Sequence, residues 1–340
     1  MKRWQFWLGI GISLIFLYIA LRGLRIVDVW DVLKTANYWW LIPGIGMYFL
    51  AVWARTWRWR YLLKPIKLIP TQRLFPTVVI GYMGNNIYPA RIGEVLRSYV
   101  LRQDEDVPMS ASLATIIVER IFDGVVMLGF VFLNLPRLAG MSGDSGFIGT
   151  IQTLAVYGAA LFAAALIFFL LAAMYPQPIF RASKVLIERL LPERYQQKTL
   201  GLAERFMEGL KALRSPASVL IVFLISLLVW LFESAKYWFV MQAFPFQVDF
   251  FTLMLMNGIV NLATTIPSAP GYVGTFDAPG IAVLKAAGVA GAVAAAYTIA
   301  LHAALWLPVT LLGFYYLARK GLGWTDMQAV GNREPRAEAG

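Results

Sequence analysis

Long apolar runs constrain the fold of this chain more than any other feature of its sequence. An α-helix rises 1.5 Å per residue, so roughly 20 apolar residues cover the ~30 Å hydrocarbon core of a bilayer. The chain is 59% hydrophobic and its mean hydropathy is +0.64, well above an ordinary soluble domain. Six stretches are long enough to cross: 4–21, 39–57, 110–133, 151–174, 217–243 and 293–317. We therefore expect an all-α polytopic membrane protein with six full transmembrane helices.

Two further apolar segments are interrupted by the same pattern, asparagine followed by Pro-x-x-x-Gly. The pattern spans Pro89 to Gly93 in the first segment and Pro270 to Gly274 in the second. Unwound backbone at membrane depth is tolerated only where it lines a protein-enclosed or watery cavity. A matched pair of broken segments is also the best sequence indication of a transport site. The residues expected to form the breaks are Pro89, Gly93, Pro267, Pro270, Gly271 and Gly274.

The placement of lysine and arginine predicts the orientation of the chain. The basic stretches are 2–3, 55–73, 181–214 and 319–320. Cytoplasmic loops carry an excess of basic residues. All these stretches fall on one side only if the broken segments, 74–101 and 250–287, are re-entrant hairpins rather than full spans. We therefore expect both termini in the cytoplasm.

This topology makes the two hairpins enter from opposite faces, so the two halves form an inverted repeat. Residues 1–320 then form a single transmembrane domain. The cytoplasmic loop 176–216 contains an amphipathic stretch, which either lies on the inner membrane surface or forms a plain connecting helix. The polar residues 321–340 are expected to form a disordered cytoplasmic tail.

Charged residues next to the first break are candidates for a ligand site. Arg91, Glu94 and Arg97 are spaced i, i+3, i+6, which places them on one helix face. Asn85 and Asn86 precede them on the other arm of the hairpin. The planar guanidinium of arginine can donate two hydrogen bonds to one phosphoryl group. The alternative is that these residues only solvate the hairpin at the cytoplasmic surface.

A second charged group lies in the middle of the predicted span 110–133 and consists of Glu119, Arg120 and Asp123. Ionisable residues at that depth rarely face lipid, and they pair with one another or line a cavity. We expect them to pair with the arginines of the first hairpin. Their role is then either purely structural or one in headgroup or proton handling.

The remaining polar residues of the apolar segments indicate a ligand site less strongly. The second hairpin has no arginine, and its candidate binding residues are Asn257, Asn261 and Asp277. Glu233 and Lys236 are spaced i, i+3 in the fifth span, so we expect them to neutralise each other.

Enzyme chemistry finds no support in the sequence. The chain has no cysteine and a single histidine, His302, which excludes thiolate and multi-histidine metal sites. A lone histidine in an apolar run is more often hydrogen bonded structurally than part of a site. No nucleotide-binding, zinc-protease or nucleophile-elbow motif occurs. We expect no enzyme activity, no cofactor and no metal. We also expect no nucleic-acid partner, because the basic residues behind the net charge of +11 are concentrated in particular loops.

The order and spacing of these residues resemble the flippase-like membrane family typified by the transmembrane part of lysylphosphatidylglycerol synthases. The matching residues are Gly81, Asn85, Asn86, Pro89, Arg91, Gly93, Glu94, Arg97, Glu119, Arg120, Asp123, Pro270, Gly271 and Gly274. The resemblance implies a bacterial inner-membrane protein that moves lipids, such as aminoacylated phospholipids, between leaflets. The soluble aminoacyl-transferase domain of the fused family members is not expected here, because the chain ends shortly after its last predicted span.

The leading hypothesis is a flippase or transporter that moves a phosphate-containing lipid between leaflets. The alternatives are a transporter of small solutes or ions, a membrane enzyme acting on lipid-linked substrates, and an accessory subunit of a lipid-modifying enzyme. Membrane lipids are the expected partners, with a separate synthase and further copies of the chain as others to consider. The substrate-binding candidates are Asn85, Asn86, Arg91, Glu94, Arg97, Glu119, Arg120, Asp123, Asn257, Asn261 and Asp277.

The predicted topology can be tested by cysteine labelling, because the chain is free of cysteine. Single cysteines in place of Lys64 and Lys198 should be protected from an impermeant thiol reagent outside intact cells, and should react once the membranes are opened. Lys285→Cys, near the expected outer surface, is the reactive control. Labelling of position 64 or 198 from outside contradicts the orientation.

Overall fold

The computed structural model describes residues 3–88, 91–140, 145–266 and 268–321, and this part of the chain forms helices joined by loops. Its α-helices are α1 (Arg3–Leu21), α2 (Ile26–Thr35), α3 (Leu41–Leu63), α4 (Thr71–Ile87), α5 (Ile92–Glu105), α6 (Met109–Leu133), α7 (Leu135–Gly140), α8 (Ser145–Met174), α9 (Pro176–Leu190), α10 (Glu193–Gly209), α11 (Pro216–Met241), α12 (Phe250–Ala263), α13 (Asp277–Ala286) and α14 (Gly291–Arg319). Short 3-10 turns are η1 (Tyr38–Trp40), η2 (Lys211–Arg214) and η3 (Pro270–Tyr272). The predicted all-α class is confirmed.

The six predicted spans coincide with six long helices, which are α1, α3, α6, α8, α11 and α14. Among the described residues, three helices are long and apolar enough to cross a membrane: Val156–Met174 of α8, α11 and α14. A fourth span results if the bent pair Ile10–Leu21 and Ile26–Thr35, which meet at 81°, crosses as one unit. Helices α3 and α6 are 23 and 25 residues long, but both carry charged residues along their length. Length and composition thus support three or four of the six spans.

The first broken segment consists of α4 and α5, which pack closely against each other. A Cβ added at Gly93 would lie 2.0 Å from the carbonyl oxygen of Gly81, and one added at Gly84 would lie 2.8 Å from the Cα of Gly93. Helices approach this closely only where the crossing residues lack side chains. The connection contains Arg91, whereas Pro89 lies outside the described residues.

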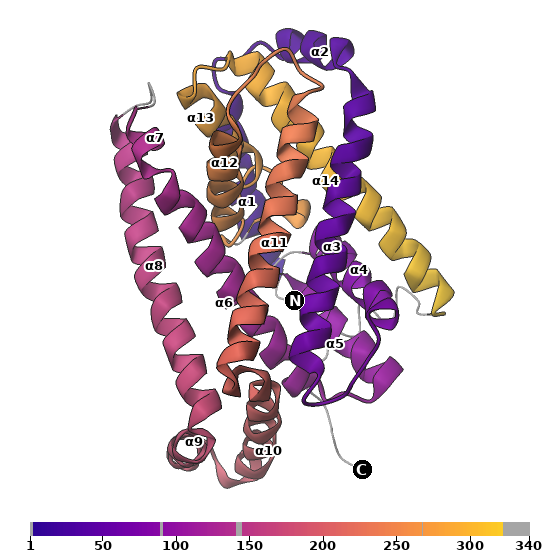
Figure 1. Ribbon diagram of the computed structural model, residues 1–340, viewed down its shortest axis with the longest axis vertical. Helices are drawn as coiled ribbons and strands as arrows, with labels where there is room; N and C mark the ends of the chain where they lie inside the picture. Colours follow the sequence, from indigo (N-terminus) through magenta and orange to yellow (C-terminus); the bar gives the residue numbers. More distant parts are fainter. Residues whose placement is uncertain (1–2, 89–90, 141–144, 267, 322–340) are drawn as a thin grey trace.

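The second broken segment also consists of two helices, α12 and α13, joined through the turn η3. Gly271 and Gly274 have φ values of +73° and +82°, which glycine adopts without steric cost. A Cβ at Gly274 would lie 2.5 Å from the carbonyl oxygen of Ser13, so α1 packs directly on this break. Pro267 lies outside the described residues. In Figure 1, α12 and α13 lie above α4 and α5.

Helices α3, α11 and α14 form the frame of the bundle and pack against one another (Figure 1). The largest side chains of this core are fully buried and include Trp59, Tyr237 and Tyr297. The Tyr297 hydroxyl donates a hydrogen bond to the backbone carbonyl oxygen of Tyr237 at 2.9 Å, which links α14 to α11. These contacts fix three of the helices that line the cavity described below.

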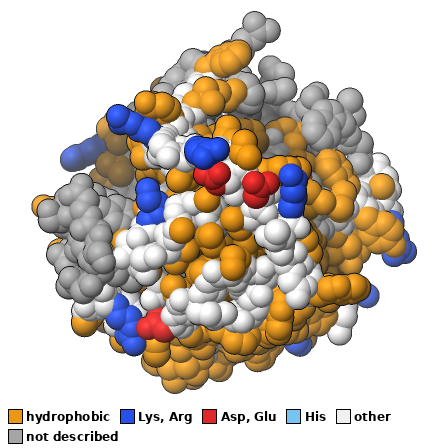
Figure 2. All heavy atoms as spheres, turned by 90° about the horizontal axis from the view of Figure 1, so that it is seen from above, with side chains coloured by type: hydrophobic (Ala, Val, Ile, Leu, Met, Phe, Trp, Pro, Cys, Tyr) orange, Lys and Arg blue, Asp and Glu red, His pale blue; other side chains and the backbone are white. Residues whose placement is uncertain are grey.

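The outer surface of the bundle is apolar. Leu161 of α8, Leu220 of α11 and Leu311 of α14 are 68%, 57% and 60% exposed. In the view from above, hydrophobic side chains extend around the rim and charged side chains are scattered (Figure 2). Exposing so much apolar surface to water is unfavourable, so this surface suits contact with lipid.

The predicted amphipathic loop 176–216 consists of α9, α10 and η2. Helix α10 is anchored on the bundle, because a Cβ at Gly209 would lie 2.3 Å from the carbonyl oxygen of Ala111 in α6. Leu210 and Leu213 are buried beside it. Its position at the inner membrane surface stays a prediction. The predicted disordered tail lies outside the described residues except for Gly321.

The close crossing of α4 and α5 predicts that Gly93→Ala destabilises the protein, because the added methyl group meets backbone atoms of Gly81 and Asn85. Overpacking of this kind costs about 1–3 kcal/mol, so the melting temperature in detergent should fall by several degrees. Gly129→Ala in α6 is the matched control, because no atom lies within 4 Å of its added Cβ. Equal melting temperatures of the two variants would contradict the crossing.

Candidate functional site

A polar cavity of about 130 Å³ lies inside the bundle, where the tips of the two broken segments meet. Its walls come from α3, α4, α6, α11, α12 and α14 together with both breaks. The charged residues that line it are Arg55, Arg91, Arg120, Glu233 and Lys236. Uncharged polar and aromatic residues complete the lining, among them Tyr48, Tyr82, Asn85, Asn86, Trp230, Asn261, Tyr272, His302 and Trp306.

Arg91 connects the tips of the two broken segments. Its Nη2 donates a hydrogen bond to the carbonyl oxygen of Thr264 at 3.3 Å, and its guanidinium lies 6.0 Å from the ring centre of Tyr272. Helix α14 joins this contact through Trp306, whose Nε1 donates to the carbonyl oxygen of Asn86 at 3.3 Å. Arg91 has φ +54°, an uncommon conformation for a residue other than glycine. A strained conformation of this kind persists only where the surrounding contacts hold it in place.

Two tight ion pairs attach α3 and α5 to α6. Arg58 of α3 makes a bidentate pair with Asp123, with N–O distances of 2.6 and 3.2 Å. Arg97 of α5 donates to Glu119 at 2.8 Å, and its guanidinium lies 3.6 Å from the ring centre of Trp59. These four charged side chains are buried and lie outside the described cavity lining. The predicted pairing of the α6 charges with an arginine of the first hairpin is therefore present.

Arg91 and Arg120 have looser ion pairs and line the cavity. Glu94 lies between them, 3.8 Å from Arg91 Nη1 and 3.5 Å from Arg120 Nε. Arg120 Nη1 is also 3.5 Å from Asp123. A charge-assisted N–H···O bond is about 2.7–2.9 Å long, so these carboxylates do not satisfy the guanidinium donors. Arg91 and Arg120 therefore have hydrogen-bonding capacity left for a ligand.

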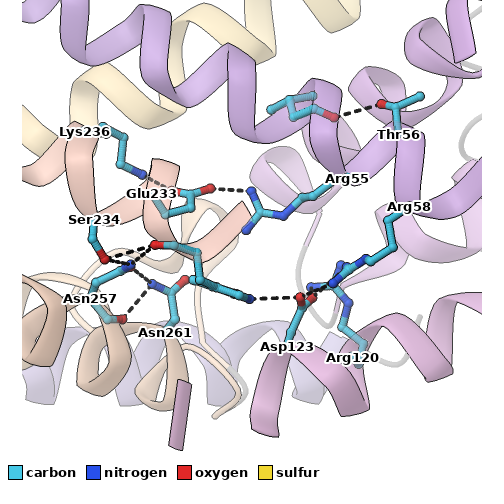
Figure 3. A network of polar contacts seen from close by, with 12 residues as sticks. Arg55, Thr56, Arg58, Arg120, Asp123, Glu233, Ser234, Lys236, Asn257 and Asn261 are labelled. Atoms are coloured by element: carbon cyan, nitrogen blue, oxygen red, sulfur yellow. Dashed lines mark hydrogen bonds and ion pairs between the residues drawn. The ribbon is translucent and has the colours of Figure 1, made fainter. Parts of the chain in front are cut away.

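A third charged cluster lies on the α3–α11 side of the cavity, where Glu233 pairs with both Arg55 and Lys236 (Figure 3). The predicted Glu233–Lys236 pair is present. Arg55 enters the cluster from α3, and its guanidinium lies 5.0 Å from the ring centre of Trp230. One carboxylate thus faces two basic groups at the cavity wall.

The structure corrects the interpretation of Arg55 and Arg58 as parts of a basic cytoplasmic stretch. They are only 6% and 0% exposed. Helix α3 continues to Leu63, well beyond the predicted end at residue 57, so these helical turns stay within the bundle. The sequence did contain a signal, because Arg55 lies inside the predicted span 39–57, where a charge indicates pairing or a cavity.

The second broken segment contributes uncharged amides. Asn257 donates to Ser234 Oγ at 3.0 Å, and Asn261 donates to Asn257 Oδ1 at 2.7 Å (Figure 3). Asn261 lines the cavity, whereas Asn257 is buried behind it. On the opposite wall, Asn85 Oδ1 is buried without a hydrogen-bond partner among the described residues. Asn85 also lines the cavity and has an unused acceptor oxygen.

His302 fixes the break between α12 and α13. Its Nδ1 lies 2.9 Å from Asp277 Oδ1, and its Nε2 lies 2.7 Å from the carbonyl oxygen of Gly271. Asp277 Oδ2 also accepts a hydrogen bond from the backbone N–H of Gly274 at 2.8 Å. Both ring nitrogens therefore face oxygen atoms of the second break, which ties this break to α14. The structural role expected for His302 is present, although the ring also borders the cavity.

The structure divides the predicted binding residues into two groups. Those in the cavity wall are Asn85, Asn86, Arg91, Arg120 and Asn261. Those that lie behind it are Glu94, Arg97, Glu119, Asp123, Asn257 and Asp277. The cavity-wall residues that the sequence analysis left out of the site are Arg55, Glu233, Lys236 and His302. Among the described residues, no group of three or more metal-ligating side chains is present.

The fold and the cavity define a multi-pass helical membrane protein with a polar, arginine-lined cavity. The chain belongs to the family described as lysylphosphatidylglycerol synthase TM region, which it matches over residues 6–313. The family resemblance inferred from the broken segments is thereby confirmed.

Several archaeal proteins are similar to this chain. A UPF0104 membrane protein of Methanothermobacter thermautotrophicus is 26% identical over 336 residues, or 92% of each chain. Another, of Methanocaldococcus jannaschii, is 23% identical over 311 residues, or 89% of this chain and 91% of the relative. Glycosyltransferase AglD of Haloferax volcanii is 25% identical over 292 residues, which are 78% of this chain but 47% of AglD. No solved structure matches significantly. Since these relatives are archaeal, a bacterial inner membrane stays a prediction.

The buried pair of Arg58 and Asp123 predicts that Asp123→Asn is strongly destabilising. Removing one charge of a buried pair costs about 3–5 kcal/mol, because the other charge is left uncompensated. Asp31→Asn is the control, since its pair with Lys34 is exposed (3.5 Å apart, 63% and 57% exposed) and should change stability by less than about 1 kcal/mol. Thermal unfolding in detergent measures both. A similar change in the two variants would show that the buried pair does not hold α3 to α6.

Proposed function

We propose that this protein moves a phosphate-bearing lipid between the two leaflets, with the headgroup in the polar cavity and the hydrocarbon chains in the bilayer. The observation that carries the proposal is the state of Arg91 and Arg120, which line the cavity while their carboxylate partners lie 3.5–3.8 Å away. A guanidinium with unsatisfied N–H groups suits the paired oxygens of a phosphoryl group. Membership of a family named after the membrane region of a lipid synthase supports a lipid substrate.

Within this proposal the cavity residues have distinct roles. Arg91 and Arg120 bind the phosphoryl oxygens, and Glu94 between them orients both guanidinium groups. Lys236 adds a compact positive charge, and Asn85 offers a polar side chain to the rest of the headgroup. The pairs Arg58–Asp123 and Arg97–Glu119 act only indirectly, because they hold α3 and α5 in place on α6.

The two broken segments supply the moving parts in this mechanism. We take them as re-entrant hairpins that enter from opposite faces and belong to the two halves of an inverted repeat. Each then controls access to the cavity from its own side, as alternating access requires. The contact of Arg91 with Thr264 and Tyr272 supports this assignment, because it joins the tips of both hairpins at the proposed headgroup site.

The proposal contains no chemical step. AglD is named as a glycosyltransferase, but the match with this chain covers 47% of AglD. The cavity described here combines basic, amide and aromatic side chains around a small polar space, a composition suited to binding an anion. We therefore propose transport rather than glycosyl transfer.

Lipid exchange in proteoliposomes tests the proposal. Arg91→Ala should lower the rate of leaflet exchange of a labelled anionic phospholipid at least about tenfold, and Arg91→Lys should restore little, because it keeps the charge but lacks the bidentate fork. Arg73→Ala is the control, since Arg73 is 71% exposed and distant from the cavity lining. Wild-type vesicles that exchange lipid no faster than empty vesicles would refute the proposed function. Unchanged exchange by folded Arg91→Ala protein would refute the headgroup site.

A further inference from the structure

The charges around the cavity do not balance. The ion-paired network of the described residues contains six basic side chains, which are Arg55, Arg58, Arg91, Arg97, Arg120 and Lys236. It contains four carboxylates, which are Glu94, Glu119, Asp123 and Glu233. The His302–Asp277 pair is a separate hydrogen-bonded pair and shares no side chain with this network. The network therefore has an excess of two positive charges.

The excess is located in the cavity wall. Behind the wall, Arg58 and Arg97 are matched by the carboxylates of Asp123 and Glu119 at hydrogen-bonding distance. The basic groups of the wall are matched less well: Glu94, behind the wall, lies between Arg91 and Arg120, and Glu233, in the wall, lies between two other basic groups. Each of these two carboxylates therefore faces two positive charges, so each leaves one positive charge uncompensated. Both uncompensated charges border the same cavity.

An uncompensated charge is costly in a site shielded from water. Arg55 and Lys236 are only 7% and 3% exposed at their side chains, so bulk water compensates them poorly. The arrangement is stable when an anion of matching charge occupies the cavity. We infer that the headgroup bound here carries two negative charges, as a phosphomonoester or a diphosphate esterified at both ends does near neutral pH. This inference rests on the proposed function and specifies its substrate class.

The same count makes other headgroups poorer ligands. A phosphodiester carries one negative charge and leaves one positive charge uncompensated. An aminoacylated phospholipid carries a cationic amino group, which the four basic groups of the wall would repel. The charge balance thus separates this chain from the aminoacylated substrates that the family resemblance implies.

The first experiment compares lipids that differ only in headgroup charge. Proteoliposomes at pH 7.5 receive tail-labelled phosphatidic acid, phosphatidylglycerol or lysylphosphatidylglycerol with identical acyl chains. We expect phosphatidic acid to exchange about tenfold faster than phosphatidylglycerol, and lysylphosphatidylglycerol to be slowest. Equal rates for the three, or fastest exchange of the cationic lipid, would overturn the inference and leave the proposed flippase function intact.

A matched variant tests the charge count directly. Asn85→Asp adds one negative charge to the cavity wall with almost no change of shape, so it should lower the preference for phosphatidic acid over phosphatidylglycerol at least about threefold. Asn37→Asp, in the loop before η1, is the control and should leave the preference unchanged. An unaltered preference in folded Asn85→Asp protein counts against the inference.

Soluble probes test the site without lipid transport. Methyl phosphate and dimethyl phosphate differ by one ester methyl group and carry about two and one negative charges. The first should raise the melting temperature of the detergent-solubilised protein more than the second, even if no lipid is exchanged; equal shifts contradict the inference. Uptake of inorganic phosphate into vesicles without lipid exchange would assign the same dianion site to free phosphate and refute the lipid proposal alone.

Discussion

Charge inside an apolar helical bundle must be paired, and the buried carboxylates of α6 pair with arginines of two neighbouring helices. Asp123 receives Arg58 from α3, and Glu119 receives Arg97 from α5. Because each side chain is withdrawn from water, neither helix can move away from α6 without leaving an uncompensated charge. The position of α3 and α5 in turn decides which basic groups reach the cavity. The cavity therefore depends on ion pairs that do not themselves line it.

The second structural requirement is the close approach of the two broken segments. Gly93 allows α5 to cross α4 at backbone contact, and the positive φ values of Gly271 and Gly274 shape the other break. These local conformations bring Arg91 within reach of Thr264, although the two residues are far apart in the chain. Both broken segments thus border the cavity. In a transporter, such elements are suited to opening and closing in turn.

Much of this organisation was predictable from sequence, because the signals are local. Apolar length predicted the long helices, and the repeated Pro-x-x-x-Gly pattern predicted where two segments are broken. The depth of Glu119 and Asp123 in an apolar run predicted that they would be paired. Helical spacing predicted the Glu233–Lys236 pair. Each of these inferences needs only the period of a helix and the cost of burying a charge. Family membership followed from the same residues.

The tertiary structure alone decided which arginines are buried in ion pairs and which line the cavity. Arg91 and Arg97 both follow the first break, yet Arg97 is buried against Glu119 whereas Arg91 lines the cavity with its carboxylate partner Glu94 3.8 Å away. In the sequence Arg55 is the first residue of a basic stretch, whereas in the structure it pairs with Glu233 of α11. The reason is physical: a side chain is available or satisfied according to its distance from groups on other helices, and charge balance is a property of the whole cluster. The sequence by itself determined which segments are helical, where two of them break and which charges must be buried. Only the packing of the helices determined which charges are matched and where the two unmatched ones lie.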